Sequence, residues 1–491
     1  MKADHHALEP RREELEHWLS VLSKFALDEV EGLASGPAVG AVGRAGLDIA
    51  DAVSQPIGEQ PLTGGVEAVT DLLRQAAGAT FIPPSPGYFA YVPGTGLFAS
   101  ALADLVSGAL NRFTGISAAA PALCRLEADV IDWLARECGY GEAAGGVLLS
   151  GSSLANLSAV ITAREEHFAA DGDYRRAVVY ASGQAHHCVE KAIRMAGLPP
   201  ANVRRVAIDS EYRLDPEDLA AKVREDRAAG LQPFLVVASA GTTNTGALDP
   251  LPAIADVCEA ESLWFHVDGA YGGAFVLCDE GRHLLAGMER ADSIALDPHK
   301  GLFLPFGTGC LLVRDAEKLR NAHSAGAHYL RDLDALDRSR EAPSPAMYGP
   351  ELSRSYRGLR LWLPLMLHGA AAFREALAEK LRLAWRFHAG LLRLIESGVP
   401  LECVAPPHLS TVPFRLTRGD SEVLADWNAR NAALIERINA QQRVYLSSTS
   451  LPVADGEAVT LRVCVLGART HAEHVDQCLA DLAAAGAAGT G

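Results

Sequence analysis

Short apolar runs alternate with helical patterns through the middle of the chain. From Gly146 to about Arg314 these runs read GVLLS, AVVYAS, VRRVAI, FLVVASA, LWFHVD, SIALD and CLLVRD. Strands that are apolar at nearly every position, and that are separated by helices, are typical of a mainly parallel sheet covered on both faces. The pattern therefore predicts an α/β fold, in which polar side chains just after the strands are candidates for a ligand site.

The region before this sheet is predominantly helical. Apolar residues recur at helical spacing over 13–30 and more weakly over 66–76, which predicts an arm of helices. The Pro/Gly-rich segment IPPSPGYFAYVPGTG follows at 82–96 and should be a loop. Its aromatic residues Tyr88 and Tyr91 are candidates for lining a substrate pocket.

A smaller α+β unit is predicted near the C-terminus. After Leu359 the pattern is helical, and it leads into the candidate strands LECVAP, TVPFRL, VYLSST and VTLRVCVLG. Two further helices are expected at about 420–441 and 471–485. The predicted units are an N-terminal helical arm, a large α/β domain and a small C-terminal α+β domain, at residues 1–85, 86–380 and 381–491.

Charge and composition narrow the class of partner. The 491 residues carry a formal net charge of −17, whereas nucleic acids and anionic membranes select basic surfaces, so a small-molecule substrate is favoured. No secretory signal is visible and no apolar run reaches the ~20 residues of a membrane span, so we expect a cytoplasmic protein. The nine cysteines are scattered without a Cys-x-x-Cys pair, which indicates reduced thiols and no metal site.

Two charged residues stand directly after apolar strands. Lys300 lies in ALDPHKGLFLPFGTG, where burial and the adjacent His299 are expected to lower its pKa and make the amine nucleophilic toward an aldehyde. Asp268 closes LWFHVD, and a carboxylate buried at that position demands a cationic partner. Helix N-capping is the alternative role for Asp268.

Three further groups follow strands in the same way. Ser152 and Ser153 open a helical pattern, and backbone N–H groups at such a position attract a phosphate. His186 and His187 follow AVVYAS, but adjacent helical residues point ~100° apart, so only one of them can stack on a ligand ring. Thr243, in the turn AGTTNTG, is a candidate hydrogen-bond donor to the same ligand.

Pyridoxal 5′-phosphate needs these four kinds of group from a protein. An amine must hold its aldehyde, an acid must face its ring nitrogen, a support must cover the ring and an anion cradle must hold its phosphate. Lys300, Asp268, His186 and the serine turn supply one candidate each.

The chain resembles the group II pyridoxal-dependent amino acid decarboxylases, the family of aromatic-L-amino-acid, histidine, tyrosine and glutamate decarboxylases. The resemblance extends from about the first helix to the C-terminal segment. Its strongest carriers, all in one order, are SPGYFAYVPG, AAPALCRLEADVIDWL, SGSSLANL, QAHHCVEKA, ASAGTTNTGALDPL, WFHVDGAYGG, DSIALDPHKG and YRGLRLWLPLMLHG. It implies the type I fold of pyridoxal-dependent transferases, similar to aspartate aminotransferase, and a homodimer with active sites at the subunit interface.

The resemblance also assigns roles to single residues. It makes Lys300 the Schiff-base lysine, Asp268 the partner of the ring nitrogen and His186 the stacking histidine. Its remaining cofactor positions match Ser152, Ser153, Thr243, His299 and Asp297. Asp297 stands where aromatic decarboxylases often have asparagine, and Gly301 where they often have tryptophan, which weakens the expectation of an aromatic substrate.

The implied reaction is decarboxylation of an L-amino acid to its amine and CO2. In the family the proton donor to Cα is typically a tyrosine in a loop ahead of the RGLRLW-like segment. Tyr348 is the nearest candidate here, and Tyr329 and Tyr356 are the alternatives. An aldehyde synthase, an aminotransferase and a non-catalytic regulator with the same fold are the competing readings, although the regulator would have no need to retain Lys300 and Asp268.

Overall fold

The computed structural model describes residues 8–168, 172–324 and 343–487. Seven strands form one sheet in the order β1-β7-β6-β5-β4-β2-β3. The strands are β1 Gly145–Leu149, β2 Ala177–Ser182, β3 Val203–Val206, β4 Gln232–Ser239, β5 Trp264–Gly269, β6 Ser293–Leu296 and β7 Gly309–Val313. All seven apolar runs of the sequence are therefore strands, as predicted.

The sheet is parallel except around β7. Strands β3, β2, β4, β5 and β6 pair in parallel, whereas β7 is antiparallel to both β6 and β1. Parallel strands need a long crossover, but the segment between β6 and β7 holds only the one-turn helix α11 (Pro298–Gly301). The chain therefore turns back beside β6, and this short return is where Lys300 lies.

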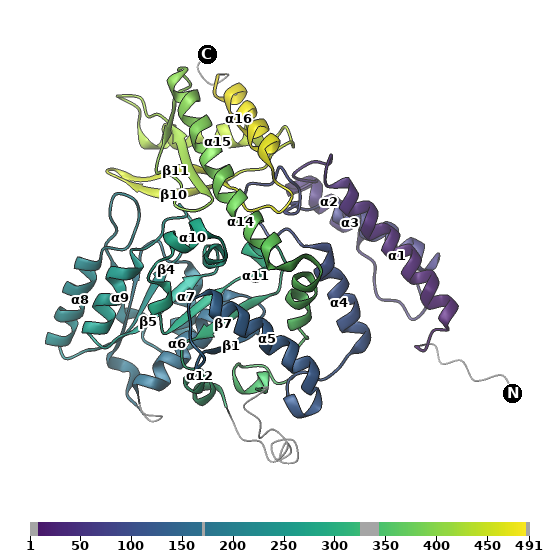
Figure 1. Ribbon diagram of the computed structural model, residues 1–491. Helices are drawn as coiled ribbons and strands as arrows, with labels where there is room; N and C mark the ends of the chain where they lie inside the picture. The colour runs from purple at the N-terminus through teal and green to yellow at the C-terminus, as the bar shows by residue number, and fades with distance from the viewer. Residues whose placement is uncertain (1–7, 169–171, 325–342, 488–491) are drawn as a thin grey trace.

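Helices cover both faces of the sheet (Figure 1). Successive strand residues point to opposite faces, so Leu148 belongs to one buried cluster while Val147 and Leu149 belong to the other. One face is covered by α5 Pro121–Glu137, α8 Pro216–Ala228 and α9 Leu251–Ala260. The other is covered by α6 Ser152–His167, α7 His187–Met195 and α12 Ala316–His323.

A second sheet forms the smaller C-terminal unit. Its order is β10-β11-β9-β8, all antiparallel, with β8 Leu401–Cys403, β9 Thr411–Leu416, β10 Ser447–Val453 and β11 Gly456–Cys464. The long helix α14 (Gly358–Glu396) connects the two units, and α15 Leu424–Asn439 and α16 Ala472–Ala487 pack on the second sheet (Figure 1). The predicted strand VYLSST starts later than expected, because Tyr445 bonds to the 87–89 loop instead of to β11.

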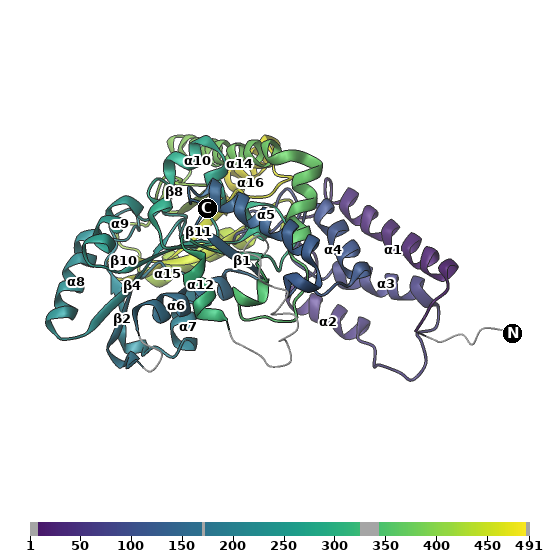
Figure 2. The ribbon, with the colours of Figure 1, turned by 60° about the horizontal axis from the view of Figure 1, so that its bottom comes forward.

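The N-terminal arm holds three helices instead of the two expected. They are α1 Arg12–Gly32, α2 Gly43–Val53 and α3 Gly65–Ala77, followed by α4 Phe98–Leu110. Figures 1 and 2 show the arm at the end of the molecule opposite α8 and α9. None of the described helices combines the length and the apolar composition that a membrane crossing requires.

Candidate active site

Most of the predicted site residues line one cavity at the carboxyl ends of the central strands. The cavity has a volume of about 550 Å³, and Ser239, Asp268 and Asp297 mark the ends of β4, β5 and β6 at its base. Lys300, His186 and the serine turn line the same cavity. Residues from five separate segments thus meet where a doubly covered sheet is expected to bind its ligand.

Lys300 is paired with a carboxylate. Its Nζ lies 2.9 Å from Oδ2 of Asp297, the residue directly before α11. Burial acts against the charged ammonium, but Asp297 and the nearby Asp268 outweigh it and raise the pKa of Lys300. The expectation of a lowered pKa was therefore wrong. His299, the cation invoked for it, donates from Nδ1 to the carbonyl of Thr308 at 2.7 Å.

The second oxygen of Asp297 is bound to the start of α6. Oδ1 accepts the backbone N–H of Ser152 at 2.7 Å, and the carboxylate is buried. Asp297 therefore joins the lysine to the helix N-terminus. His299 Nε2 lies 3.7 Å from the same carboxylate, on the cavity wall.

Asp268 is buried and already accepts two hydrogen bonds. Oδ2 accepts from Nδ2 of Asn156 at 3.0 Å, and Oδ1 accepts from the N–H of Ala270 at 3.1 Å. No α-helix begins at the turn after Asp268, so the N-cap alternative is excluded. The remaining lone pairs leave the carboxylate able to accept a cationic N–H from the cavity.

The N-terminus of α6 offers an anion cradle. Ser152 Oγ is buried and has no hydrogen-bond partner among the described residues, and Ser153 lines the cavity beside it. Gly309 on β7 lets this turn approach, because a Cβ there would lie 2.4 Å from the backbone of Gly151. The unpartnered hydroxyl and the positive end of the helix dipole together suit a phosphate, although the Ser152 N–H is taken by Asp297.

Only one of the two adjacent histidines lines the cavity, although their ring centroids lie 4.1 Å apart. His186 lines the cavity, while His187 is exposed and begins α7. His186 also caps that helix, because its Nδ1 accepts the N–H of Cys188 at 3.3 Å. Burial lowers the pKa of His186, although Asp268 opposes this shift, so the imidazole is neutral at physiological pH. A neutral ring can cover the face of a bound heterocycle.

Thr243 and one of the two loop tyrosines line the Lys300 cavity, whereas the other tyrosine does not. Thr243 lines the cavity. Tyr91 also lines it, with a left-handed backbone (φ 53°) held by the bond from its N–H to Ser447 Oγ at 2.9 Å. Tyr88 does not line it. This residue is buried and stacks on Tyr445 with ring centroids 5.7 Å apart, so in its own chain it packs the loop against the C-terminal unit instead of facing Lys300.

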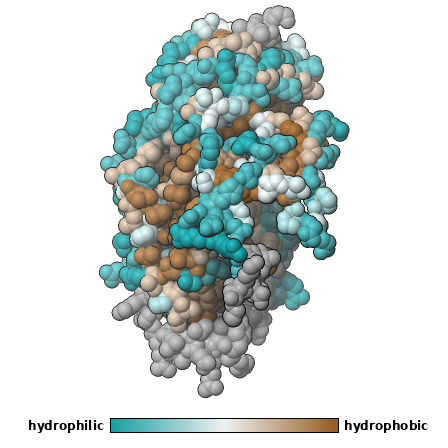
Figure 3. Space-filling view, turned by 90° about the vertical axis from the view of Figure 1, so that its right-hand side faces the viewer, coloured by the Kyte–Doolittle hydropathy of each residue, from teal (hydrophilic) through white to brown (hydrophobic). Residues whose placement is uncertain are grey.

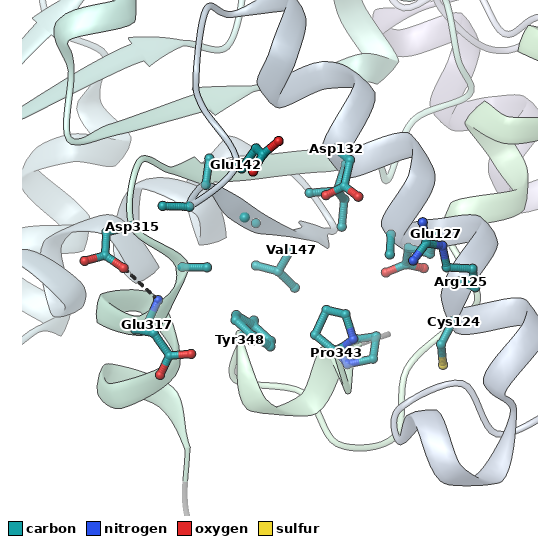
Figure 4. A pocket seen from close by; sticks show the side chains of 18 residues that line it. Cys124, Arg125, Glu127, Asp132, Glu142, Val147, Asp315, Glu317, Pro343 and Tyr348 are labelled. Carbon is teal, nitrogen blue, oxygen red and sulfur yellow. Dashed lines mark hydrogen bonds between the residues drawn. The ribbon is translucent and has the colours of Figure 1, made fainter. Parts of the chain in front are cut away.

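Tyr348 lies in a different cavity. That cavity has a volume of about 460 Å³, and Figure 4 shows Tyr348 beside Pro343, across from Asp132 and next to Val147 of β1. The prediction that Tyr348 faces the lysine is therefore not met within its own chain. Tyr356 is buried and donates to the carbonyl of Leu123 at 2.8 Å, away from Lys300. Tyr329 lies outside the described residues.

Gly301, the second departure from the aromatic decarboxylases, does not enlarge the cavity. A Cβ at this position would lie 2.4 Å from Cβ of Ala274. The space beside α11 is therefore filled by a neighbouring segment. Gly301 consequently carries no information about the size of the substrate.

Three candidate functional residues were not identified from the sequence. Asn156 and His266 stand behind Asp268, and Arg462 is buried in β11. Arg462 Nη1 donates to Ser447 Oγ at 3.2 Å, but Nε and Nη2 have no partner among the described residues. The only local signals were a histidine two residues before Asp268 and one charge inside the apolar run VTLRVCVLG.

The donor set fits pyridoxal phosphate. A lysine amine, a buried carboxylate, a neutral imidazole and an unpartnered serine hydroxyl at a helix N-terminus converge on one cavity. Each satisfies one of the four needs of that cofactor. Within the described ranges, no group of three or more metal-ligating side chains competes with this interpretation.

Comparison with known proteins gives a concordant result. Residues 80–417 match the pyridoxal-dependent decarboxylase conserved domain. The chain is 34% identical over 395 residues to an aromatic-L-amino-acid decarboxylase of Bacillus atrophaeus, covering 80% of this chain and 79% of that protein. It is 32% identical over 408 residues to a phenylacetaldehyde synthase of Petunia hybrida, covering 80% and 79%. The crystal structure of Catharanthus roseus tryptophan decarboxylase in complex with L-tryptophan superposes with a TM-score of 0.87 at 26% identity, covering 98% of this chain and 99% of that one.

Proposed function

Since the chain belongs to the pyridoxal-dependent decarboxylase family and is a pyridoxal phosphate-dependent amino acid decarboxylase, we propose that it converts an aromatic L-amino acid to the corresponding amine and CO2. The observation that carries this proposal is the convergence of Lys300, Asp268, His186 and Ser152 on one cavity. Relatives at 32–34% identity named for aromatic substrates or products support the substrate class.

Each residue is proposed to hold one part of the cofactor. Lys300 would bind the aldehyde carbon, Asp268 would face the ring nitrogen and His186 would cover the ring. Ser152, Ser153 and the N-terminus of α6 would hold the phosphate, with Thr243 and His299 on the walls. When bound, pyridoxal phosphate supplies the electron sink that accepts the bonding electrons as CO2 departs.

The substrate side chain would lie near Tyr91. Tyr91 is 53% exposed and meets Phe81 edge to face, with centroids 6.3 Å apart. An aromatic substrate side chain beside Tyr91 would gain the same edge-to-face or offset contacts that aromatic rings prefer. Arg462 shares Ser447 Oγ with the Tyr91 N–H, and we propose that its buried positive charge attracts the carboxylate of the amino acid.

The proton delivered to Cα must come from a group in the Lys300 cavity. His186 lines that cavity, whereas Tyr348 does not in its own chain. We therefore propose His186 as the donor within one chain. In its own chain the 343–348 segment does not line the Lys300 cavity. Donation by Tyr348 would therefore require this segment to approach that cavity.

A homodimer is the proposed assembly. Large apolar side chains remain exposed on α1, α3 and α4, and Figure 3 shows apolar groups gathered on this side of the molecule. They are Leu15, Trp18, Leu19, Leu22, Leu27, Val69, Leu73, Leu102, Leu105, Val106 and Leu110. Sedimentation velocity should show a dimer that Leu105→Glu dissociates, while Met195→Glu, exposed on α7, leaves it intact.

The test of the proposed reaction is product analysis over a panel of aromatic, acidic and aliphatic L-amino acids. Equal amounts of amine and CO2 from an aromatic substrate are expected. The second candidate, favoured by the phenylacetaldehyde synthase relative, consumes one O2 and one water to yield aldehyde, CO2, ammonia and hydrogen peroxide. Oxygen uptake with aldehyde would establish that alternative, and amine from only acidic or aliphatic substrates would refute the aromatic assignment.

A further inference from the structure

A line of buried polar side chains outside the cavity leads to Asp268. Trp264, His266 and Asp268 alternate along β5 and so share one face, and Ser293 of β6 is the register partner of His266. Asn156 of α6 covers them. Trp264, Ser293, His266 and Asn156 do not line the cavity, so cofactor binding does not explain why polar groups stand there.

Four hydrogen bonds connect this line. Trp264 Nε1 lies 2.9 Å from Ser293 Oγ, and Ser293 Oγ lies 2.8 Å from His266 Nδ1. His266 Nε2 lies 2.8 Å from Asn156 Oδ1, and Asn156 Nδ2 lies 3.0 Å from Asp268 Oδ2. All five residues are buried.

The orientation of the Asn156 amide follows from its neighbours. Its two N–H groups have two acceptors, Asp268 Oδ2 and Cys188 Sγ at 3.2 Å. Burial raises the pKa of Cys188 to about 12, so its sulfur is a neutral thiol. The reversed amide would set Oδ1 against the Asp268 carboxylate, acceptor against acceptor. Oδ1 therefore faces His266, and His266 must carry its proton on Nε2.

The direction of the remaining bonds follows from His266. Burial lowers its pKa to about 4, although Asp268 opposes this shift, so the ring is neutral and has a single N–H. With that proton on Nε2, Nδ1 accepts, and the Ser293 hydroxyl must donate to it. Ser293 Oγ in turn accepts from Trp264 Nε1, which can only donate. Every bond thus donates toward Asp268.

We propose that Trp264, Ser293 and His266 are positioning residues that fix the Asn156 amide with its N–H toward Asp268, and so keep Asp268 a charged acceptor for a cationic ring nitrogen. This inference rests on the proposed role of Asp268. Without the Ser293 hydroxyl, Nδ1 has no donor, the other tautomer of His266 becomes accessible and the amide is free to reverse. A carbonyl oxygen beside Asp268 would favour the protonated acid, which no longer stabilises a cationic nitrogen.

The experiment measures the protonation state of the cofactor's ring nitrogen directly. Holoenzyme is prepared with pyridoxal phosphate labelled with 15N in the ring, and the 15N chemical shift reports whether that nitrogen carries a proton. Ser293→Ala should move the signal toward the unprotonated position and weaken cofactor binding about tenfold, since one buried hydrogen-bond donor is lost. Ser293→Thr keeps the hydroxyl and should retain the wild-type signal. Ser158→Ala makes the same change at an equally buried serine of α6 outside the line, and should also be silent.

Each negative result refutes a different part of the proposal. An unchanged signal in Ser293→Ala, or a folded Ser293→Thr that behaves like the alanine variant, overturns the inference. Asp268→Asn tests the underlying assignment, because it should abolish the protonated signal. If Asp268→Asn shifts the signal and Ser293→Ala does not, only the positioning role fails. If neither shifts it, Asp268 is not the ring partner. Should Ser293→Ala not fold, His266→Phe removes the same connection and must give the same shift.

Discussion

Oδ2 of Asp297 lies 2.9 Å from Nζ of Lys300, while the other oxygen of the same carboxylate accepts the first N–H of α6. One side chain thus stabilises the charged form of the lysine and occupies part of the proposed phosphate cradle. Cofactor uptake requires a neutral amine and an available helix N-terminus. Asp297 acts against both.

Asp297→Asn should therefore speed the capture of pyridoxal phosphate by the apoenzyme. The amide oxygen still accepts from Ser152, but the charge that raises the pKa of Lys300 is gone. A larger fraction of neutral amine follows at neutral pH, about tenfold for each unit by which the pKa falls. Stopped-flow absorbance measures the rate. Slower capture would show that the carboxylate assists the reaction with the aldehyde.

Lys300→Ala should leave a folded protein without the yellow colour of lysine-bound cofactor. Borohydride should then give no stable adduct, because the amine in the cavity has been removed. Mass spectrometry after reduction checks this. A reduced adduct on any other lysine would displace Lys300 from the assignment, and Lys318→Ala, at a surface ion pair with Glu166, is the matched control that should keep colour and adduct.

Tyr348→Phe is expected to leave the product unchanged. In its own chain Tyr348 lines the second cavity, so loss of its hydroxyl should not affect protonation at Cα. The amine-to-aldehyde ratio is the measurement. A shift to aldehyde and hydrogen peroxide would restore the sequence-based hypothesis that this phenol donates, and would require Tyr348 to reach a Lys300 cavity by movement or from a second chain.

Acid should destabilise the protein partly through His266. Its pKa is lowered by burial from 6.5 to about 4, so the unfolded chain binds more protons between these values and stability falls as pH drops through that window. At pH 5 the cost is on the order of 2 kcal/mol. Urea unfolding of wild type and His266→Phe at pH 5 and 7 isolates this contribution, since the other titrating groups are common to both. Parallel pH dependences would contradict it.

The sequence by itself determined the layered fold and most of the cavity. Six of the seven runs are apolar at nearly every position, which leaves a strand no exposed face, and they form the covered part of one sheet. The seventh, VRRVAI, contains Arg204 and Arg205 and forms the partly exposed edge strand β3. The residues that end those strands, among them Asp268 and Asp297, had to meet at one edge, and Lys300 follows in the short return after β6. These inferences rely on local periodicity and chain order, which sequence records directly.

Only the tertiary structure decided the pKa values, the exposure and the hydrogen-bond partners of those groups. The pKa of Lys300 rises because the one-turn helix α11 brings Asp297 onto its amine, a matter of side-chain direction that spacing alone does not resolve. Tyr88 is buried and Tyr91 exposed, although both stand in the same loop. Asn156 and His266, 110 residues apart, meet because a helix packs over a strand. Electrostatics depends on distances between segments remote in sequence, and those distances exist only in the folded chain.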